Sequence, residues 1–316
     1  MTLIQAIILG IVQGLTEFIP ISSTAHLVLA GRIMDLPLTA QQTTASIAVI
    51  QLGTLLAVFV YFARDIWNIA RAFVGDHLAL LSGKKRVLPG GETSVALSRD
   101  AWLGWLVIIG SIPVGVVGLL FKKQIEGTFT KSLWVIATMM IFVGLLLAIA
   151  EVVGKKTRGM NDLGVGDALA IGAAQALSLI PGSSRSGSTI MAGLFAGETR
   201  ETAARFSFLL SIPAIAASGL LELKEAIHSL PQSSLGPLAV ATAVSGVVGY
   251  ASIWFLLRFL RTHTTGIFIG YRLIVGAIIL VLLFSGRISP LNEPPAASVN
   301  NPTVSSGTIL PGFQSN

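Results

Sequence analysis

The sequence lacks cysteine altogether and has few charged residues. Of its 316 residues, none is cysteine and only 11% are Asp, Glu, Lys or Arg. The absence of cysteine excludes disulfide frameworks, cysteine-ligated zinc, iron–sulfur clusters and thiol-based catalysis. A soluble globular domain carries about 25% charged residues, so this chain has too little charge to cover a water-exposed surface. Hydrophobic residues make up 53% instead. The composition therefore predicts a protein that is embedded in a lipid bilayer.

The net charge of +6 does not point to a nucleic-acid partner, because basic and aromatic residues are not interleaved on a polar scaffold. In membrane proteins an excess of Lys and Arg marks the cytoplasmic loops. With residues 64–100 placed on the inside, 13 of the 21 Lys and Arg lie inside and 6 outside, while Arg185 and Arg272 lie within apolar segments. This bias predicts that both termini are outside.

Six apolar runs are long enough to cross a bilayer, which takes about 20 largely apolar residues. Five of them carry no charge, and the sixth carries only Arg272. The six runs are 44–63, 101–121, 132–150, 206–221, 236–257 and 266–286.

Two further apolar stretches, 2–30 and 168–196, are each interrupted by a proline and a pair of serines. Proline ends a helix, and at membrane depth the freed backbone groups need protein or water partners. We therefore expect two re-entrant elements, each a short helix, a polar turn and a second short helix that returns to the same side.

The two broken stretches also resemble each other in sequence. Gly10, Gln13, Leu15 and Thr16 align with Gly172, Gln175, Leu177 and Ser178 at an offset of 162, and Pro20, Ser22 and Ser23 align with Pro181, Ser183 and Ser184 at 161. Three spans follow each copy, and an odd number of spans turns the second copy upside down.

The sequence thus predicts an all-α integral membrane protein with about six spanning helices and two re-entrant helix–turn–helix elements in an inverted repeat. The first repeat is expected over 1–153 and the second over 154–286. The residues 287–316 are rich in Pro, Ser and Asn and are expected to form a disordered polar tail.

Ionisable residues inside membrane segments are costly and therefore mark candidate functional sites. The first broken stretch contains Glu17 and His26, and the second contains Arg185. An arginine among hydroxyls, glycines and a helix N-terminus suits a phosphate group, which it can bind through two oxygens. A carboxylate, an imidazole and hydroxyls opposite it suit nucleophilic attack with acid–base help, or the holding of a divalent cation.

We therefore assign candidate roles to two groups of residues. The candidate catalytic residues are Glu17, Ser23, His26 and Arg185, and the candidate substrate-binding residues are Gln13, Thr24, Ser184, Ser186 and Thr189. The nucleophile is left open between Ser23, His26 and water. Arg272 is left open between a structural role and a role in the site.

Residues 13–26 and 181–189 resemble the two signature motifs of the undecaprenyl-diphosphate phosphatase family of bacterial membranes. The resemblance covers residues 1–284 and includes weaker stretches at 50–53, 206–210 and 271–272. It implies hydrolysis of the terminal phosphate of undecaprenyl diphosphate to the monophosphate, which recycles the lipid carrier for cell-wall synthesis and relates to bacitracin resistance. It also implies a multi-pass protein of the bacterial plasma (inner) membrane with its active site facing outside.

The same resemblance implies a divalent cation, Mg or Ca, with Glu17 as a ligand. Gln13 stands where the family often has Glu, which weakens any arrangement with two metal-binding carboxylates there. The expected partners are the polyprenyl diphosphate lipid and the bilayer, with no nucleic acid and with a homo-oligomer left open. The competing hypothesis is a transporter or flippase for an anionic polyprenyl phosphate or a small anion, because broken helices in inverted repeats are common in transporters.

Overall fold

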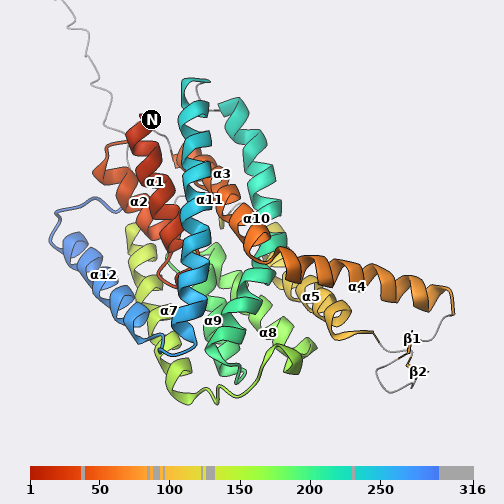
Figure 1. The fold of residues 1–316 in the computed structure, drawn as a ribbon. Coiled ribbons are helices and arrows are strands. Elements are labelled where there is room, and N and C mark those ends of the chain that lie inside the picture. The colour runs from red at the N-terminus through yellow and green to blue at the C-terminus, as the bar shows by residue number, and fades with distance from the viewer. Residues whose placement is uncertain are drawn as a thin grey trace, which may run out of the picture.

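The computed structural model describes residues 1–36, 40–83, 86–87, 93–94, 97–121, 124–125, 132–229 and 232–291, and in these ranges the protein is a helical bundle (Figure 1). The long helices are α1 (Leu3–Thr16), α2 (Ser23–Ile33), α3 (Ala40–Tyr61), α4 (Ala63–Leu81), α5 (Arg99–Leu120), α7 (Leu133–Val153), α8 (Val165–Ala176), α9 (Arg185–Phe195), α10 (Arg200–Ser229), α11 (Gln232–Leu260) and α12 (Gly266–Phe284). The short elements are the 3-10 turns η2 (Met160–Asp162) and η3 (Leu177–Leu179) and the antiparallel strands β1 (Arg86–Val87) and β2 (Thr93–Ser94).

The prediction of an all-α membrane protein with about six spans is confirmed. Within the described ranges, five helices are long and apolar enough to cross a bilayer, namely α5, α7, the first 22 residues of α10, α11 and α12. The bent pair of α3 and α4 passes the same test only when taken together and is the sixth candidate. All six apolar runs of the sequence lie mainly in these helices.

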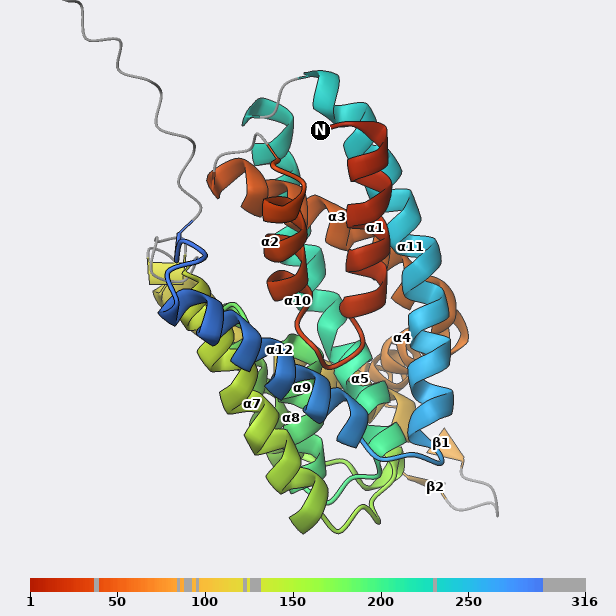
Figure 2. The ribbon, with the colours of Figure 1, turned by 90° about the vertical axis from the view of Figure 1, so that its left-hand side faces the viewer.

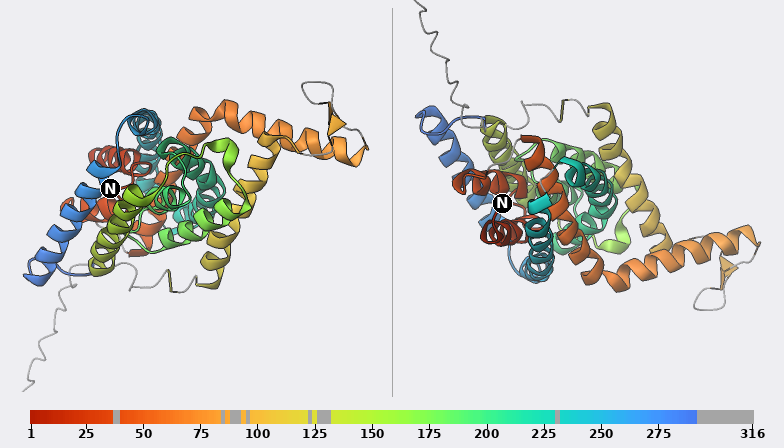
Figure 3. Two further views of the ribbon diagram at one scale, coloured as in Figure 1. Left: turned by 90° about the horizontal axis from the view of Figure 1, so that it is seen from below. Right: turned by 90° about the horizontal axis from the view of Figure 1, so that it is seen from above.

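The region 64–100, which the charge distribution places inside, contains the helix α4, for which no secondary structure was predicted from the sequence. The helix α4 follows α3 after a bend of 74° and runs out from the bundle (Figures 1 and 3). Its apolar residues recur at helical spacing among charged ones, as in an amphipathic helix. Charge alone indicates the side of the membrane and not the secondary structure, and the inside placement stays a prediction.

Both interrupted stretches form the predicted helix–turn–helix. The first is α1, a break at 17–22 and α2, which packs beside α1 and runs back along it (Figure 2). The second is α8, η3, a break at 180–184 and α9. The backbone of Ser22 and of Ser184 has positive φ, at 78° and 67°, and each hydroxyl caps the helix that follows. The polar turns therefore end one helix and start the next.

The cap geometry corrects the sequence alignment of the two turns. Ser22 and Ser184 occupy the same N-cap position, and α2 and α9 begin 162 residues apart at Ser23 and Arg185. The offset of 162 therefore holds through the break, and the sequence match of Ser22 with Ser183 at 161 does not hold at the caps. The backbone conformation needed to start a helix fixes the correspondence, whereas matching serines in a short turn do not.

Each broken element packs on a spanning helix of the other half, α1 on α11 and α8 on α5. These crossings are close because glycines face backbone. A Cβ on Gly172 would lie 2.1 Å from the carbonyl oxygen of Gly110, and a Cβ on Gly10 would lie 2.5 Å from that of Ala241. The remaining helices of the two halves also pair, α3 with α10 and α7 with α12. The boundaries of the two repeats stay a prediction.

The turn of the first element lies in the largest apolar core. Phe18 is fully buried against Phe208 of α10, with ring centroids 5.2 Å apart, in a cluster that includes Ile190 and Met191 of α9. Burying such a side chain contributes about 1.5–3 kcal/mol. This core holds the two broken elements against each other.

The structure describes residues 287–291 of the expected tail, and two of them are tied to the bundle. The backbone carbonyl of Ser289 accepts a hydrogen bond from Arg32 Nη1 at 2.6 Å, and that of Pro290 accepts one from the backbone N–H of Leu133 at 2.9 Å. Residues 292–316 of the predicted disordered tail lie outside the described residues.

Candidate active site

The centre of the site is the carboxylate of Glu17, which follows the last residue of α1 and is 4% exposed. Its Oε1 accepts a hydrogen bond from Arg185 Nη2 at 2.8 Å. Its Oε2 accepts from Ser23 Oγ at 2.8 Å and from Gln13 Nε2 at 2.8 Å, with Gln51 Nε2 farther away at 3.4 Å. A buried carboxylate needs this many donors, because an unpaired charge in a low-dielectric interior is costly.

Arg185 reaches Glu17 because it is the first residue of α9, where the capped turn aims it across the interface between the two broken elements. The guanidinium is nearly buried, and only one of its two terminal nitrogens is paired. Nη2 contacts Glu17, whereas Nη1 is buried and has no hydrogen-bond partner among the described residues. A second orphaned atom is Oε1 of Gln13, whose Nε2 donates to the same carboxylate. Unsatisfied buried polar groups of this kind are rare and often indicate a ligand.

His26 does not join this group, contrary to the expectation of an acid–imidazole pair. Its Nδ1 lies 2.7 Å from the backbone carbonyl oxygen of Ser22, and its Nε2 lies 2.7 Å from the hydroxyl of Tyr271, whose ring stacks on the imidazole. Since a carbonyl only accepts, Nδ1 carries the proton and Nε2 accepts from Tyr271. No hydrogen bond links His26 to Glu17 or Arg185 in the structure.

The predicted substrate-binding hydroxyls differ in the groups that they contact. Ser184 Oγ caps α9 by accepting from the backbone N–H of Gly187, and Ser186 Oγ lies within 3.3 Å of the carbonyl oxygens of Glu17 and Ile19. Ser186 thus ties the two turns together. Thr24 is half-buried on the first turn of α2, and its hydroxyl makes no hydrogen bond to any of the residues that the structure describes.

Thr189 is directed away from the site. Its hydroxyl lies 2.8 Å from the carbonyl oxygen of Arg185 and 2.6 Å from Ser207 Oγ of α10, and the residue is fully buried. A threonine inside a helix commonly bonds to the carbonyl four residues earlier, and this one also supports the packing of α9 on α10. The structure therefore does not bring Thr189 to the predicted phosphate position.

Arg272 holds the two turns from a third direction. This arginine of α12 is completely buried, and all of its hydrogen bonds go to backbone carbonyl oxygens. It donates to Pro20 in the first turn and to Gly182 and Ser183 in the second, at 3.2, 3.1 and 2.9 Å. Two further bonds reach Met139 and Met140 of α7. Its charge, together with Arg185, leaves the neighbourhood of Glu17 net positive, which suits an anionic ligand.

Two contributors to the site were not assigned a role from the sequence. Gln51 lies in the stretch 50–53, which resembles the family weakly and belongs to an otherwise apolar span. Tyr271 directly precedes Arg272 in α12. A polar side chain inside an apolar run is the signal that could have identified Gln51. Nothing local marks Tyr271, since its contact with His26 joins residues 245 positions apart.

The described residues contain no group of three or more His, Cys, Asp and Glu side chains that could hold a metal ion. In the described part of the site Glu17 supplies the one carboxylate, and its oxygens already accept hydrogen bonds from Arg185, Ser23 and Gln13. These side chains alone do not fit a resident Mg or Ca, which takes at least six ligands, mostly oxygens. The expected cation therefore stays a prediction.

A family of known proteins matches the chain over all the residues of the site described above. A sequence model described as bacitracin resistance protein BacA matches residues 6–278. A protein of Syntrophobacter fumaroxidans named undecaprenyl-diphosphatase is 49% identical over 286 residues, which are 90% of this chain and 98% of the relative. Proteins of the same name from Mycolicibacterium gilvum and Chlorobaculum tepidum are 45% and 46% identical, over 92% of this chain and 100% of each relative.

Proposed function

The chain belongs to the family of the bacitracin resistance protein BacA, and from that premise we propose that it removes the terminal phosphate of undecaprenyl diphosphate and leaves the monophosphate. The observation that carries the proposal is the buried pair of Glu17 and Arg185, joined across the two broken elements with the Ser23 hydroxyl on the same carboxylate. The names of the relatives favour the phosphatase over the transporter hypothesis.

In the proposed reaction Arg185 binds the terminal phosphate. Its free nitrogen Nη1 can donate to a phosphate oxygen while Nη2 stays on Glu17. A guanidinium is planar and carries five N–H donors, so it can serve the carboxylate and the phosphate together. Arg272 lies behind the turns and adds a positive field without touching the substrate. Both charges would stabilise the negative charge that develops as the phosphoanhydride bond breaks.

Ser23 is the nucleophile that the geometry favours, because its hydroxyl already donates to Glu17 at 2.8 Å. As Ser23 Oγ attacks the terminal phosphorus, its proton passes to Glu17, a P–O bond forms to the serine, and the anhydride P–O bond breaks. The lipid leaves as the monophosphate. Glu17 passes this proton to the departing monophosphate and is ionised again. Water then attacks the phosphoserine with Glu17 as the base. The P–O bond to Ser23 breaks, inorganic phosphate is released, and Glu17 returns the proton to the Ser23 oxygen.

His26 takes a supporting place in this scheme. Its Nε2 accepts a hydrogen bond from Tyr271, so it is not free to attack phosphorus while that bond is made. Its contact with the Ser22 carbonyl holds the first turn of α2, where Ser23 lies. We propose that His26, held by Tyr271, positions the nucleophile Ser23. Because the described side chains of the site do not by themselves fit a resident divalent cation, a cation would enter with the diphosphate substrate and help to neutralise its charge, while Glu17 stays the base.

The membrane placement is part of the same proposal. The excess of Lys and Arg in the loops on one side supports a plasma-membrane protein with both termini outside. The first broken element would then be re-entrant from the outside, with the active site open to that face and the polyprenyl tail among the lipids. The described site is built from one chain, so the proposal does not require a homo-oligomer, which stays a prediction.

The test is release of inorganic phosphate from a polyprenyl diphosphate by purified protein in detergent. We expect turnover by the native chain and a loss of at least a hundredfold in Ser23→Ala and in Arg185→Gln. Ser111→Ala is the matched control, because its hydroxyl bonds only to the carbonyl of Val107 in its own helix. Phosphate release that is undiminished in both site variants would contradict the mechanism. Absence of release, with protein-dependent lipid movement across liposomes, would favour the transporter.

A further inference from the structure

The helix α4 leaves the bundle at the point where a membrane span ends. The helix α3, which contains the predicted span 44–63, ends at Tyr61; the chain then bends by 74°, and α4 runs from Ala63 to Leu81. At 1.5 Å per residue its 19 residues extend about 28 Å. A helix nearly perpendicular to the span before it runs along the membrane surface rather than through it. Figures 1 and 3 show this helix projecting beyond the rest of the bundle.

Contacts with α5 indicate the depth at which α4 lies. Phe73 packs within reach of Gly104, and His77 Nε2 accepts a hydrogen bond from Trp105 Nε1 at 3.1 Å. The span α5 begins at Arg99, so these contacts are made five and six residues into it. That distance is about 8 Å along the helix. It corresponds to the boundary between lipid headgroups and acyl chains, where amphipathic helices lie.

One face of α4 is apolar and exposed. Trp67, Val74, Leu78 and Leu81 recur at helical spacing and are 67, 57, 60 and 85% exposed. Together we call them the α4 stripe. Four large apolar side chains on one helix face are too many to be explained as scattered surface residues. They do not include Phe73 and His77, which belong to the face on α5.

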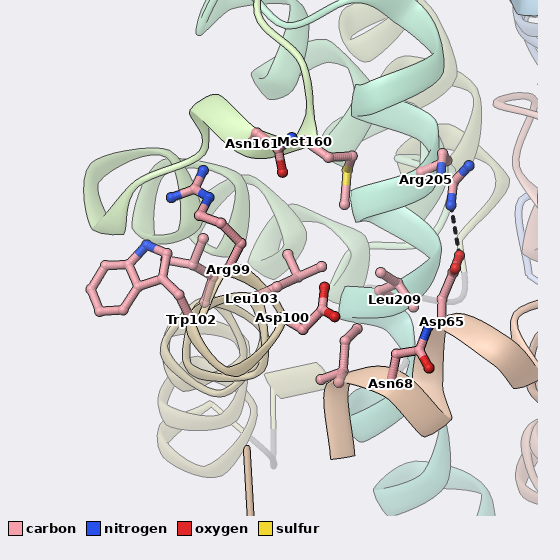
Figure 4. Close-up of a pocket in the computed structure, with 12 residues that line it drawn as sticks. Asp65, Asn68, Arg99, Asp100, Trp102, Leu103, Met160, Asn161, Arg205 and Leu209 are labelled. Atoms are coloured by element: carbon pink, nitrogen blue, oxygen red, sulfur yellow. Dashed lines mark hydrogen bonds and ion pairs between the residues drawn. The ribbon is translucent and has the colours of Figure 1, made fainter. Parts of the chain in front are cut away.

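The opposite face of α4 is polar and looks into a cavity of about 150 Å³. Figure 4 shows Asp65 and Asn68 of α4 in this cavity, together with Arg205 of α10, to which Asp65 is bonded. Arg99 and Asp100 of α5 and Asn161 of η2 add further polar groups to its lining. The rest of the lining is largely apolar and comprises Ile69, Trp102, Leu103, Leu106, Met160 and Leu209. Because η2 belongs to the connection between α7 and α8, the polar end of this cavity lies on the aqueous side of α4. The α4 stripe is roughly 140° around the helix from Asp65 and Asn68 and therefore faces the bilayer.

We propose that α4 is an interfacial helix whose partner is the lipid bilayer, with the α4 stripe inserted among the acyl chains. The bend after a span, the depth on α5, the exposed stripe and the polar end of the cavity on the other side all place it there. Arg64 and Arg71 lie at the edge between the stripe and the polar face. From that position their side chains extend to lipid phosphates, so anionic lipids strengthen the contact.

The chain has no cysteine, so single spin labels can be placed without removing any residue first. Labels at Val74→Cys and Leu78→Cys report on the stripe, and Gly75→Cys is the matched control. Gly75 is exposed on the polar side, and a Cβ there would meet nothing within 4 Å. The labelled full chains are reconstituted in liposomes with and without anionic phospholipid. Collision of each label with oxygen, which concentrates in lipid, is compared with collision with a water-soluble nickel chelate.

We expect at least a threefold higher ratio of oxygen to nickel collision at Val74 and Leu78 than at Gly75. Nickel access at all three positions would place α4 in water and overturn the proposal. Low access to both reagents at the stripe, with spin–spin broadening that disappears on dilution with unlabelled protein, would show that a second copy covers the stripe and would also overturn it. All three positions are exposed, so the labels do not disturb the core, and retained elution of the detergent-solubilised protein verifies the fold.

Discussion

Glu198 is a buried carboxyl group whose ionisation should make the protein less stable as the pH rises. It lies in the turn between α9 and α10, is fully buried, and neither of its carboxyl oxygens has a hydrogen-bond partner among the described residues. Burial raises the pKa of Glu198 from 4.5 to about 7, and the nearby negative charge of Asp167 adds to the increase. Arg158 works against it but is engaged by Asp167.

The direction of the effect follows from the two pKa values. The folded state holds the proton up to about pH 7, whereas the unfolded chain loses it near pH 4.5. Stability from this group is therefore fully present below pH 4.5 and declines as the pH rises, until the folded carboxyl ionises near pH 7. A difference of about 2.5 pKa units corresponds to roughly 3 kcal/mol at 1.36 kcal/mol per unit.

The variant Glu198→Gln removes the titration and keeps the size of the side chain. We expect it to be about as stable as the native chain near pH 5 and roughly 3 kcal/mol more stable at pH 8. The measurement is the thermal unfolding midpoint of detergent-solubilised protein by circular dichroism from pH 5 to 8.5. Glu201→Gln is the control, because its carboxylate pairs with Arg261 at the surface. The reasoning is refuted if the native chain and Glu198→Gln show the same pH dependence.

Three other results are expected. Arg272→Lys should lower kcat more than tenfold, with a smaller change in KM and only a modest loss of stability. The reason is that an ammonium group can donate to at most three of the five carbonyls that Arg272 contacts. A kcat equal to that of the native chain would contradict the positioning role of Arg272. Gly172→Ala should destabilise the chain by about 1–3 kcal/mol in unfolding experiments, whereas Gly166→Ala in the same helix meets no atom within 4 Å and should not. Chelation of divalent cations should abolish phosphate release by the detergent-solubilised protein and leave its circular dichroism spectrum unchanged; full activity after exhaustive chelation would exclude the cation.

The pairing of Glu17 with Arg185 could be anticipated from the sequence because charge is costly in a membrane. An acid and an arginine in two apolar stretches that resemble each other have a strong reason to meet, and they do, at 2.8 Å. The spans were predictable for the same reason, since about 20 apolar residues in a row have few alternatives to a spanning helix. Helix caps were less predictable, because their identity depends on backbone dihedral angles at Ser22 and Ser184.

The sequence by itself determined that the protein is embedded in a lipid bilayer and about how many spans it has. It also determined where two apolar stretches break and which charged residues lie at those breaks. These features depend on composition and local order along the chain. The tertiary structure alone decided that His26 turns to Tyr271, that Thr189 turns to Ser207, that Arg272 collects carbonyls from both turns and that α4 bends away from α3. Each of these outcomes depends on contacts between residues distant in sequence or on the angle between two helices, and neither is encoded in local patterns of polarity.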